Sequence, residues 1–497
     1  MKLNMKIILL LVLSCSMTAS VWAKGDVKQA VVKIYTVYDK YDYDEPWQMS
    51  GQKSVNGSGC IIKGKRILTN AHVVADQTFI QVKKAGDARK YTAEVEVVAH
   101  KCDLALLKVG DDSFFDGVDP IEIGNLPKVR DRVAVYGFPE GGDELSITEG
   151  VVSRIEHSHY SHSSAELLTC QIDAAINGGN SGGPVLRGDR LVGVAFQALS
   201  GRNVENIGYM VPSTVINHFL TDIADGKYDG IPGLGVSAQR MENSDLRFRF
   251  GMGETQTGVL IKEIDLDSPA EGILEPEDVL LSIDGVSIEN DGTVEFREGE
   301  RTSLEYLIQK KQINESVTLQ VLRERKVVNV AIELSMLLHF SRLVPNEQYD
   351  RAPTYYVFGG MVFEPLTLNY LKTWGRRWSR RAPGDLSNYC LYGRRTHDRK
   401  EVIVLVKVLA DEINAGYHDL ENRVISHVNG KKISTMADLV AAFVEHDGEY
   451  HLILDEHGYQ VVLDKRKVDS RSESILQRYK ISSDRSEDLA RFTISKN

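Results

Sequence analysis

The sequence has no long apolar run, few cysteines and no excess of basic residues. No stretch reaches the ~18 apolar residues of a membrane-spanning helix, which argues against an integral membrane protein of that kind. Lys and Arg number 59 against 70 Asp and Glu, a formal net charge of −11, so the basic surface of a general nucleic-acid binder is missing. Hydrophobic residues at 42% and charged residues at 26% are typical of a globular chain, and 497 residues predict about two to four domains.

The cysteines are too few and too scattered for a disulfide-stapled scaffold, and none forms the C-x-x-C pair of a zinc site. They are Cys15, Cys60, Cys102, Cys170 and Cys390. We expect the last four to be free structural thiols, although an oxidising compartment would allow them at most two disulfides.

The first 23 residues have the order of a secretory signal peptide. Lys2 and Lys6 give a positive start, an apolar run from 7 to 13 follows, and the small Ala23 ends a cleavage site. Cleavage after Ala23 would remove two lysines and leave a net charge of −11 − 2 = −13. The pattern predicts export to the periplasm, with secretion or lipid attachment through Cys15 as alternatives.

From about residue 27 to 220 the pattern is one of short strands separated by turns. Strands are expected at 31–37, 60–62, 66–69, 104–109 and 133–136. Many short strands without long amphipathic helices predict an all-β barrel or sandwich. The first good helix pattern comes late, at 213–224, and a linker follows it, ending at Pro232.

The remainder of the chain contains a repeat at an offset of 145 residues. Residues 278–288 align without gaps on 423–433, and each copy places Asp-Gly or Asn-Gly between apolar alternations, a strong hairpin signal. A Gly-rich turn precedes each copy, and a helix and a β-hairpin follow it. The helices are expected at 303–310 and 436–444, and the hairpins at 317–332 and 450–463. Two related small α/β modules are therefore predicted.

These patterns divide the chain into five parts. They are a signal peptide (1–23), a β-rich domain (24–228), a first module (229–340), a second module with a basic insertion (341–468) and a charged tail (469–497). The insertion lies near 371–400, where nine Lys or Arg face two Asp. We expect the insertion to be solvated and to face a partner, with nucleic acid or anionic lipid as a weaker option, and the tail to be a solvated helix.

The segment 173–185, Asp-Ala-Ala-Ile-Asn-Gly-Gly-Asn-Ser-Gly-Gly-Pro-Val, is the most informative in the chain. A serine hydroxyl needs an adjacent base, a group that orients the base, and donors for a developing oxyanion. Glycines around Ser181 allow the N–H groups of Gly179 and Ser181 to converge on one oxygen. His72, at the end of a strand, is the candidate base, and Asp103 is the candidate orienting acid.

The order of these residues along the chain distinguishes two kinds of hydrolase. Gly179-Asn-Ser-Gly-Gly183 also matches the G-x-S-x-G elbow of α/β hydrolases, which place the acid and the histidine after the serine. Here His72 and Asp103 precede Ser181 on a β-rich background, which is the chymotrypsin-like order. Each residue alone has a structural explanation, but all three in the correct order favour a catalytic triad.

Three blocks of sequence together closely resemble the trypsin-like domain of the HtrA (Deg) serine proteases. They are Thr69-Asn-Ala-His-Val-Val, Asp103-Leu-Ala-Leu-Leu-Lys and Gly179-Asn-Ser-Gly-Gly-Pro. The two C-terminal modules look like the PDZ domains of that family, and the second, with Tyr355-Tyr-Val-Phe-Gly-Gly-Met-Val-Phe, looks most like the branch known from organellar Deg proteases. The resemblance implies a mainly β fold, a chymotrypsin/trypsin-like double β-barrel followed by two α/β PDZ-like domains. Gly178 departs from the proline that many members have before Gly-Asn-Ser.

The same resemblance implies an ATP-independent serine endopeptidase that acts on unfolded or damaged proteins in quality control. It further implies a homotrimer or larger homo-oligomer, no cofactor, no metal site and no nucleic-acid partner. A chaperone or peptide-binding protein with a resting-inactive triad is the alternative. Labelling of Ser181 by a fluorophosphonate would distinguish the two.

The resemblance also assigns supporting residues. The oxyanion hole would comprise Gly179, Asn180 and Ser181. The specificity pocket would be lined by Ala175, Ile176, Asn177, Ala195, Phe196 and Gln197; none is acidic, so small or medium aliphatic residues are expected before the cut. The first PDZ-like module would bind peptides at Gly233, Leu234, Gly235 and Val236, whereas the second would serve assembly, its groove filled by its own chain or a neighbour.

His157, His159 and His162 form the pattern H-x-H-x-x-H. In a polar loop without a nearby cysteine or carboxylate set, we expect solvated histidines rather than a metal site. The resemblance makes this segment the family's sensor loop, between the barrel and the first PDZ-like module.

Overall fold

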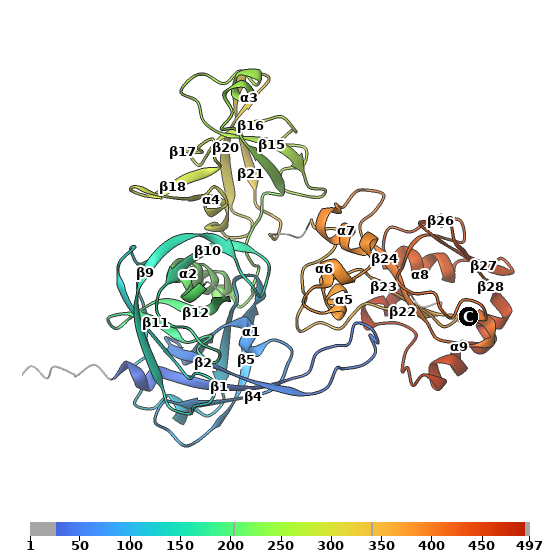
Figure 1. The fold of residues 1–497 in the computed structure, drawn as a ribbon, viewed down its shortest axis with the longest axis horizontal. Coiled ribbons are helices and arrows are strands. Elements are labelled where there is room, and N and C mark those ends of the chain that lie inside the picture. Colours follow the sequence, from blue (N-terminus) through green and yellow to red (C-terminus); the bar gives the residue numbers. More distant parts are fainter. Residues whose placement is uncertain (1–25, 202–203, 339–340, 493–497) are drawn as a thin grey trace, which may run out of the picture.

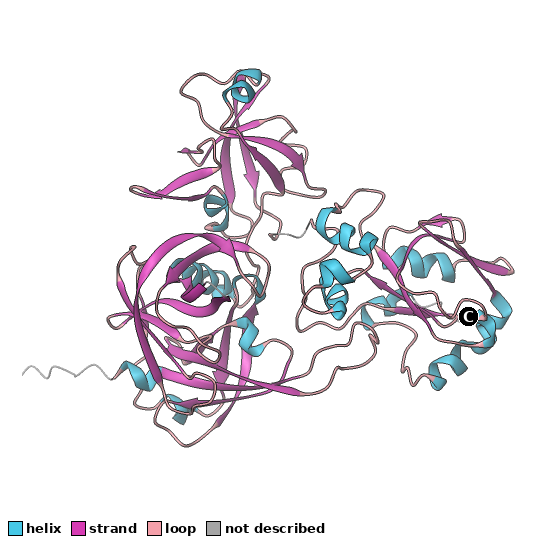
Figure 2. Cartoon of the chain, in the orientation of Figure 1, coloured by secondary structure: helices cyan, strands magenta, loops and turns pink. Residues whose placement is uncertain are grey.

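The computed structural model describes residues 26–201, 204–338 and 341–492, so the predicted signal peptide lies outside the described residues. The described chain is mostly β-structure, with two closed barrels followed by two further sheets and a short two-stranded one (Figure 1). The helices are short, and most of them lie in the second of the two C-terminal modules (Figure 2). The predicted mainly β architecture is confirmed.

The first barrel closes in the strand order β1-β2-β3-β6-β5-β4. Its strands are β1 (Val31–Tyr38), β2 (Lys53–Ile62), β3 (Arg66–Thr69), β4 (Gln77–Lys84), β5 (Tyr91–Ala99) and β6 (Leu104–Val109). Alternate side chains of a strand point to the same side, so Val32 and Ile34 of β1 enter the interior together and are fully buried. The strands predicted at 66–69 and 104–109 are confirmed to the residue.

The second barrel is a ring of six strands in the order β8-β9-β10-β13-β12-β11, closed by pairing of β11 with both β8 and β12. Its strands are β8 (Arg132–Gly137), β9 (Ser146–His159), β10 (Glu166–Ile172), β11 (Pro184–Arg187), β12 (Arg190–Gly201) and β13 (Val204–Pro212), and β7 (Glu122–Ile123) joins β12 in parallel. The helix predicted at 213–224 is confirmed as α2 (Ser213–Asp222), whose buried Ile216 and Phe219 pack toward the barrels.

The first C-terminal module is a sheet in the order β14-β15-β16-β20-β21. Its elements are β14 (Val236–Arg240), α3 (Ser244–Arg249), β15 (Val259–Ile264), β16 (Val279–Ile283), β17 (Val286–Ser287), β18 (Thr293–Arg297), β19 (Glu300–Ser303), α4 (Glu305–Gln309), β20 (Ser316–Arg323) and β21 (Lys326–Glu333). Among the described residues β14 pairs only with β15, so one of its edges is free.

The second module repeats this order with one extra strand: β22-β23-β24-β25-β27-β28. Its elements are β22 (Tyr356–Phe358), β23 (Met361–Pro365), α5 (Leu368–Leu371), α6 (Trp378–Arg381), α7 (Gly384–Tyr392), β24 (Ile403–Val408), β25 (Arg423–Val428), β26 (Lys431–Lys432), α8 (Met436–Val444), β27 (Tyr450–Asp455) and β28 (Gln460–Asp464). Strand β23 corresponds to β14, and β22 covers the edge that β14 leaves free. Phe358 of β22 stacks on Phe443 of α8 at 4.0 Å between ring centroids, so the groove is filled by its own chain.

One expectation about solvated segments is wrong, and a second one holds only in part. The segment after residue 468 packs onto the second module through α9 (Lys465–Arg478), whose Val468 and Ile475 are each 1% exposed. The buried Asp411 carboxylate accepts hydrogen bonds from Arg471 at 2.7 Å and Arg478 at 3.0 Å, which anchors the charged face of α9. The basic insertion forms α6 and α7, and its Leu386 and Cys390 are buried, although the arginines of 376–381 remain exposed. Apolar residues spaced within these charged segments account for both outcomes.

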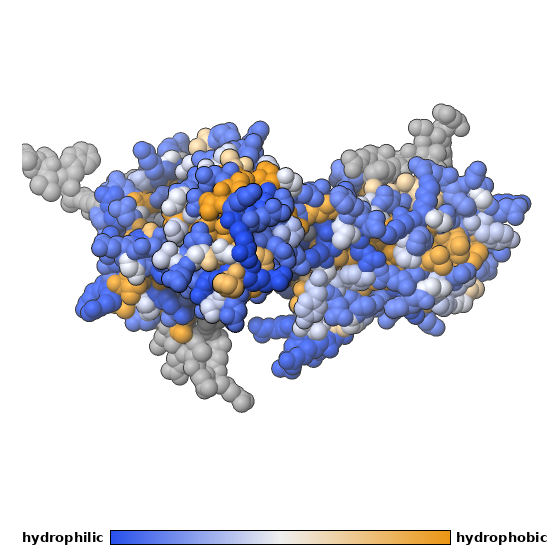
Figure 3. All heavy atoms as spheres, turned by 90° about the horizontal axis from the view of Figure 1, so that it is seen from above, coloured by the Kyte–Doolittle hydropathy of each residue, from blue (hydrophilic) through white to orange (hydrophobic). Residues whose placement is uncertain are grey.

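The first module stands on the second barrel, whereas the second module lies beside the first barrel (Figure 1). The loop 39–52, between β1 and β2, extends from the barrel to the second module. Asp44 of this loop pairs with Lys407 of β24 at 2.6 Å, and Trp47 contacts Tyr355 edge-on. Seen from above, the molecule has two lobes whose surface is mostly hydrophilic, with small apolar groups (Figure 3).

Within the described ranges, no helix combines the length and apolar character that crossing a membrane requires. Cys60, Cys102, Cys170 and Cys390 are buried free thiols, as predicted.

The burial of α9 predicts that Ile475→Ala destabilises the second module. Removing this buried side chain should cost about 2–4 kcal/mol, because it leaves a cavity against the module. Native-state hydrogen exchange of the amides of β24 and β25 measures the loss. The exposed neighbour Glu473 is the control, and Glu473→Ala should change stability by less than about 0.5 kcal/mol. Equal effects of the two substitutions would contradict a packed α9.

Candidate active site

The loop that carries Ser181 is held in shape by two glycines with positive φ. Gly179 has a φ of +91°, and a Cβ there would lie 2.3 Å from Phe138 O. Gly182 has a φ of +84°, and a Cβ there would lie 2.1 Å from Ser58 O and 2.2 Å from Thr69 Oγ1. Any side chain at these positions would clash with backbone, so only glycine fits. Because Gly182 lies against Ser58 and Thr69, the loop that carries Ser181 lies beside the end of β3, shortly before His72.

His72 and Asp103 come from neighbouring segments of the first barrel. His72 lies in α1 (Ala71–Val74), directly after β3, and Asp103 lies between the short helix η2 (His100–Cys102) and β6. His72 Nδ1 is 2.7 Å from Asp103 Oδ2, and the His72 N–H donates to Asp103 Oδ1 at 2.9 Å. A carboxylate can only accept, so Nδ1 carries the hydrogen and the lone pair stands on Nε2.

The buried pair shifts the pKa of both partners. Burial alone works to lower the pKa of the His72 imidazole, but the charge and hydrogen bond of Asp103 outweigh it and leave that pKa raised. Burial alone works to raise the pKa of Asp103, but the His72 charge and hydrogen bond leave it lowered. The Asp103 side chain is 1% exposed and that of His72 is 31% exposed, so Asp103 is sealed in while His72 reaches the surface.

Ser58 of β2 joins the first barrel to the nucleophile loop. Its N–H donates to Ser181 O at 2.8 Å, and its hydroxyl donates to Gly179 O at 2.7 Å. The same hydroxyl accepts from Phe138 N at 2.9 Å, and Thr69 Oγ1 donates to Ser58 O at 2.7 Å. A fully buried serine with every polar group bonded fixes the loop geometry.

The loop presents two backbone donors. Among the described residues, the N–H groups of Gly179 and Ser181 donate to no acceptor, whereas the N–H of Asn180 donates to Asn177 O at 3.0 Å. The donors available for an oxyanion are therefore Gly179 and Ser181, and Asn180 closes the turn. Gly178, the departure from the family's proline, accepts from Glu140 N at 2.7 Å, which secures the loop from the other side.

The predicted pocket residues flank the nucleophile loop, with different roles for their side chains. Ala195 exchanges backbone hydrogen bonds with Gly182 and Gly183 at 2.8 and 3.0 Å, which places β12 beside Ser181. Ile176 and Phe196 belong to the barrel cores, and Phe196 packs on Tyr160 at 4.6 Å. The members with solvent access are Ala175, Asn177 and Gln197, and Gln197 also bonds Ser161 N and His159 O.

The three histidines of H-x-H-x-x-H do not converge. His157 and His159 lie in β9 rather than in a polar loop, and the expectation that all three are solvated is wrong for His157 and His162. His157 is bonded to Thr302 Oγ1 at 2.8 Å and Gln309 Oε1 at 3.0 Å, both in the first C-terminal module. His162 is 8% exposed and lies 6.0 Å from the His72 ring, whereas His159 is exposed. Burial lowers the pKa of His157 and of His162 to about 4.

Sequence reasoning missed Ser58, His100, His162 and Tyr349 as neighbours of the site. Tyr349, in the segment between the two C-terminal modules, stacks on His162 at 4.0 Å. Only the order Ser-Gly in β2 hinted at Ser58, and no local pattern pointed to the other three, because their contacts span 62 to 250 residues of chain.

The comparisons with known proteins agree with this geometry. "Protease Do-like 4, mitochondrial" of Arabidopsis thaliana is 42% identical over 456 residues, which cover 91% of this chain and 84% of that protein. "Protease Do-like 2, chloroplastic" of the same plant is 38% identical over 468 residues, covering 93% of this chain and 75% of that protein. The chain belongs to the HtrA (Do-like) family of serine proteases.

Family profiles also match the separate domains of this HtrA protease. A profile described as trypsin-like peptidase domain matches residues 57–194, and two profiles described as PDZ domain match 232–334 and 344–488. The resemblance to HtrA proteases is thereby confirmed, with a serine protease domain and two PDZ modules. Among solved structures, the chain is similar to "HtrA-type protease AlgW with decapeptide", with 25% identity and a TM-score of 0.47 over 62% of this chain and 95% of that one.

The raised pKa of His72 predicts where activity of this HtrA protease falls in acid. A general base works only when deprotonated, so kcat/KM should decline as pH falls through the pKa of His72, at a midpoint above the ordinary 6.5. Hydrolysis of a quenched peptide between pH 5 and 9 measures this midpoint. A wild-type midpoint below 6.5 would contradict the proposed coupling of His72 with Asp103.

The substitution Asp103→Asn should lower kcat on the order of 10⁴-fold, because the tautomer of His72 is no longer held.

Proposed function

We propose that this chain is an ATP-independent endopeptidase that cuts unfolded or damaged proteins through a Ser181–His72–Asp103 triad. The observation that carries the proposal is the His72–Asp103 pair at 2.7 Å beside a Ser181 loop in which the N–H groups of Gly179 and Ser181 have no acceptor among the described residues. Assembly as a homotrimer or larger homo-oligomer and export to the periplasm belong to the same proposal. They rest on the family resemblance and on the order of the first 23 residues.

In this proposal each group of the triad has one task. Ser181 Oγ attacks the carbonyl carbon of the scissile bond while His72 Nε2 takes the hydroxyl proton, and Asp103 stabilises the resulting imidazolium. The N–H groups of Gly179 and Ser181 donate to the oxyanion. His72 then gives its proton to the leaving amine nitrogen, and water releases the acyl group from Ser181 by the same steps in reverse order.

The alternative, a chaperone with a resting-inactive triad, would be favoured by an oxyanion loop that is collapsed or occupied. The observed loop favours the protease, since its Gly179 and Ser181 N–H groups face no internal acceptor among the described residues. Gly178 and Asn180 are meanwhile held by backbone bonds to Glu140 and Asn177.

The first test is Ser181→Ala, which removes the nucleophile and leaves the backbone donors in place. Casein hydrolysis should fall on the order of 10⁴-fold or more, while oligomer size and thermal unfolding stay unchanged. Ser379, exposed on α6 and distant in sequence from the site, supplies the matched control Ser379→Ala. Proteolysis by the purified Ser181→Ala protein would contradict the assignment of the triad.

A second test concerns the residue before the cut. The six proposed pocket residues are all uncharged, so a lysine or arginine side chain would enter as an unpaired charge at a cost of several kcal/mol. We expect cuts after valine, alanine and isoleucine to outnumber cuts after basic residues by at least about tenfold. Mass spectrometry of the casein products counts the cuts after each type of residue. A majority of cuts after Lys or Arg would contradict the proposed specificity pocket.

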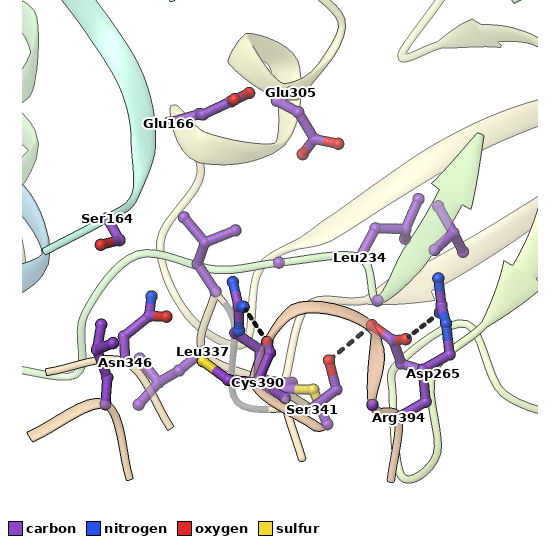
Figure 4. Close-up of a pocket in the computed structure, with 18 of the residues that line it drawn as sticks. Ser164, Glu166, Leu234, Asp265, Glu305, Leu337, Ser341, Asn346, Cys390 and Arg394 are labelled. Carbon is purple, nitrogen blue, oxygen red and sulfur yellow. Dashed lines mark hydrogen bonds and ion pairs between the residues drawn. The ribbon is translucent and has the colours of Figure 1, made fainter. Parts of the chain in front are cut away.

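The first PDZ module has the features of a site for peptide C-termini. The N–H of Gly233 donates to Met336 O at 2.9 Å, whereas those of Leu234 and Gly235 have no acceptor among the described residues. The strand that follows, β14, has a free edge for an added peptide strand. A cavity of about 780 Å³ opens at this turn, between the module, the sensor loop and the second PDZ module (Figure 4).

Two carboxylates face this cavity from its helix side. Glu305 of α4 and Glu166 at the start of β10 lie close together there (Figure 4). Burial, reinforced by the Glu166 charge, raises the pKa of Glu305 to about 7. The groove therefore disfavours a further negative charge on the peptide near α4.

This charge pattern gives the third test. The probe is a peptide with an acetylated N-terminus and a free C-terminal carboxylate. A peptide with lysine or serine among its last three residues should bind about tenfold more tightly than the same peptide with glutamate there. Glu305→Gln should remove that preference, whereas Glu333→Gln, on the exposed face of β21, should keep it. Fluorescence polarisation with the Ser181→Ala protein measures both. Equal affinity for all three peptides in the parent protein would contradict the role of Glu305.

A further inference from the structure

The segment 344–354, which leads into the second PDZ module, runs across the protease domain beside the catalytic histidine. Asn346 Nδ2 donates to Ser163 O at 3.1 Å, and the Tyr349 hydroxyl donates to His162 O at 2.8 Å. Asp350 N donates to Asp76 Oδ1 at 2.8 Å. These bonds link the segment to the sensor loop and to the turn before β4.

The ring of His162 fills the space between this segment and the catalytic pair. It stacks on the Tyr349 ring at 4.0 Å with an interplanar angle of 24°, and it lies 6.0 Å from the His72 ring. A ring atom, Nε2, is 3.0 Å from His100 Nδ1. His162 is thus a buried side chain beside His72, and Tyr349 packs against it.

The hydrogen bonds of His100 and His162 limit the charge that the two rings can carry together. Asp350 Oδ2, which can only accept, is 2.8 Å from His100 Nε2, so that nitrogen carries a hydrogen. The bond between His100 Nδ1 and His162 Nε2 has room for one hydrogen, so the two rings cannot both be fully protonated. The charged or titratable groups that face His162 are Asp103, His72, His100, Glu347 and Tyr349. Burial lowers the pKa of His162 to about 4, which leaves it neutral near pH 7.

We propose that Tyr349 is a positioning residue for proteolysis: through His162 it holds the His72 imidazole in place, so the segment leading into the second PDZ module completes the active site. A neutral, packed His162 limits the ring of His72 to the orientation in which Asp103 holds Nδ1–H. It also leaves Asp103 to His72 alone, because no second cation competes for that carboxylate. The proposal rests on the triad function proposed for His72.

The second PDZ module is thereby coupled to the chemistry through chain continuity. Six residues after Tyr349, Tyr355 packs in the core of that module with Leu343, Val344 and Tyr43, which lies in the loop between β1 and β2. A module that leaves the barrel would pull Tyr349 from His162. The alternative is that Tyr349 only fastens the module to the barrel, without effect on His72.

The experiment compares Tyr349→Ala with Tyr349→Phe in the full-length protein. The substrate is a short quenched peptide with an amidated C-terminus, so that it presents no carboxylate to the first PDZ groove. Tyr349→Ala should lower kcat about tenfold with KM within about twofold, because the loss concerns orientation rather than substrate binding. Tyr349→Phe keeps the ring stack and should stay within about threefold of the parent in kcat. The labelling rate of Ser181 by a fluorophosphonate should follow kcat.

Trp47→Ala is the matched control, since it removes another contact of the second module without touching His162. Its kcat should remain within about twofold of the parent. The inference is overturned if Tyr349→Ala leaves kcat unchanged, if Tyr349→Phe is as impaired as Tyr349→Ala, or if Trp47→Ala is as impaired as either. Should Tyr349→Ala fail to fold, Asp350→Asn replaces it, because it removes the charge that fixes His100; a kcat equal to the parent's would then overturn the inference. An inactive parent protein would instead refute the proposed function.

Discussion

The seam between the two barrels at Ser58 is the constraint on which the active site depends. His72 and Asp103 belong to the first barrel and Ser181 to the second. The catalytic groups can therefore act together only if the two barrels are held in one relative position. Ser58 fixes that position. Its N–H donates to Ser181 O, and its hydroxyl donates to Gly179 O and accepts from Phe138 N. Ser58, Gly179 and Phe138 are buried, and a buried polar group without a partner costs about 1–3 kcal/mol, so the seam has few alternative arrangements.

The sensor loop extends this constraint outward to both PDZ modules. His157 at its start bonds to the first module, and His162 near its end packs under the segment that leads to the second. Both rings are neutral near pH 7, which makes the contacts depend on packing and hydrogen bonds rather than on surface charge. Interactions of this kind are little screened by salt, unlike the exposed pair of Asp44 with Lys407.

The two PDZ modules share a fold but differ in what occupies the edge next to the Gly-rich turn. In the first module β14 is unpaired on that side, and the N–H groups of Leu234 and Gly235 are free of internal acceptors. In the second, β22 pairs with β23, and Phe358 lies on Phe443 where an added strand would place its side chains. The same backbone therefore offers an open site in one copy and a closed one in the other, because three extra aromatic-rich residues precede the second turn.

The sequence alone determined the elements whose signals are local. Strands at 66–69 and 104–109, the helix at 436–444, the repeat of the two modules and the order His72, Asp103, Ser181 all follow from short-range periodicity, turn residues and motif spacing. Tertiary structure alone decided that α9 and part of the basic insertion are packed, that His162 is buried, that His157 bonds to the first PDZ module, and that Tyr349 lies beside the catalytic histidine. Burial of a polar or charged segment depends on partners that the chain brings from far away, such as Asp350 reaching His100 across 250 residues, and no local pattern encodes which distant surface will cover it.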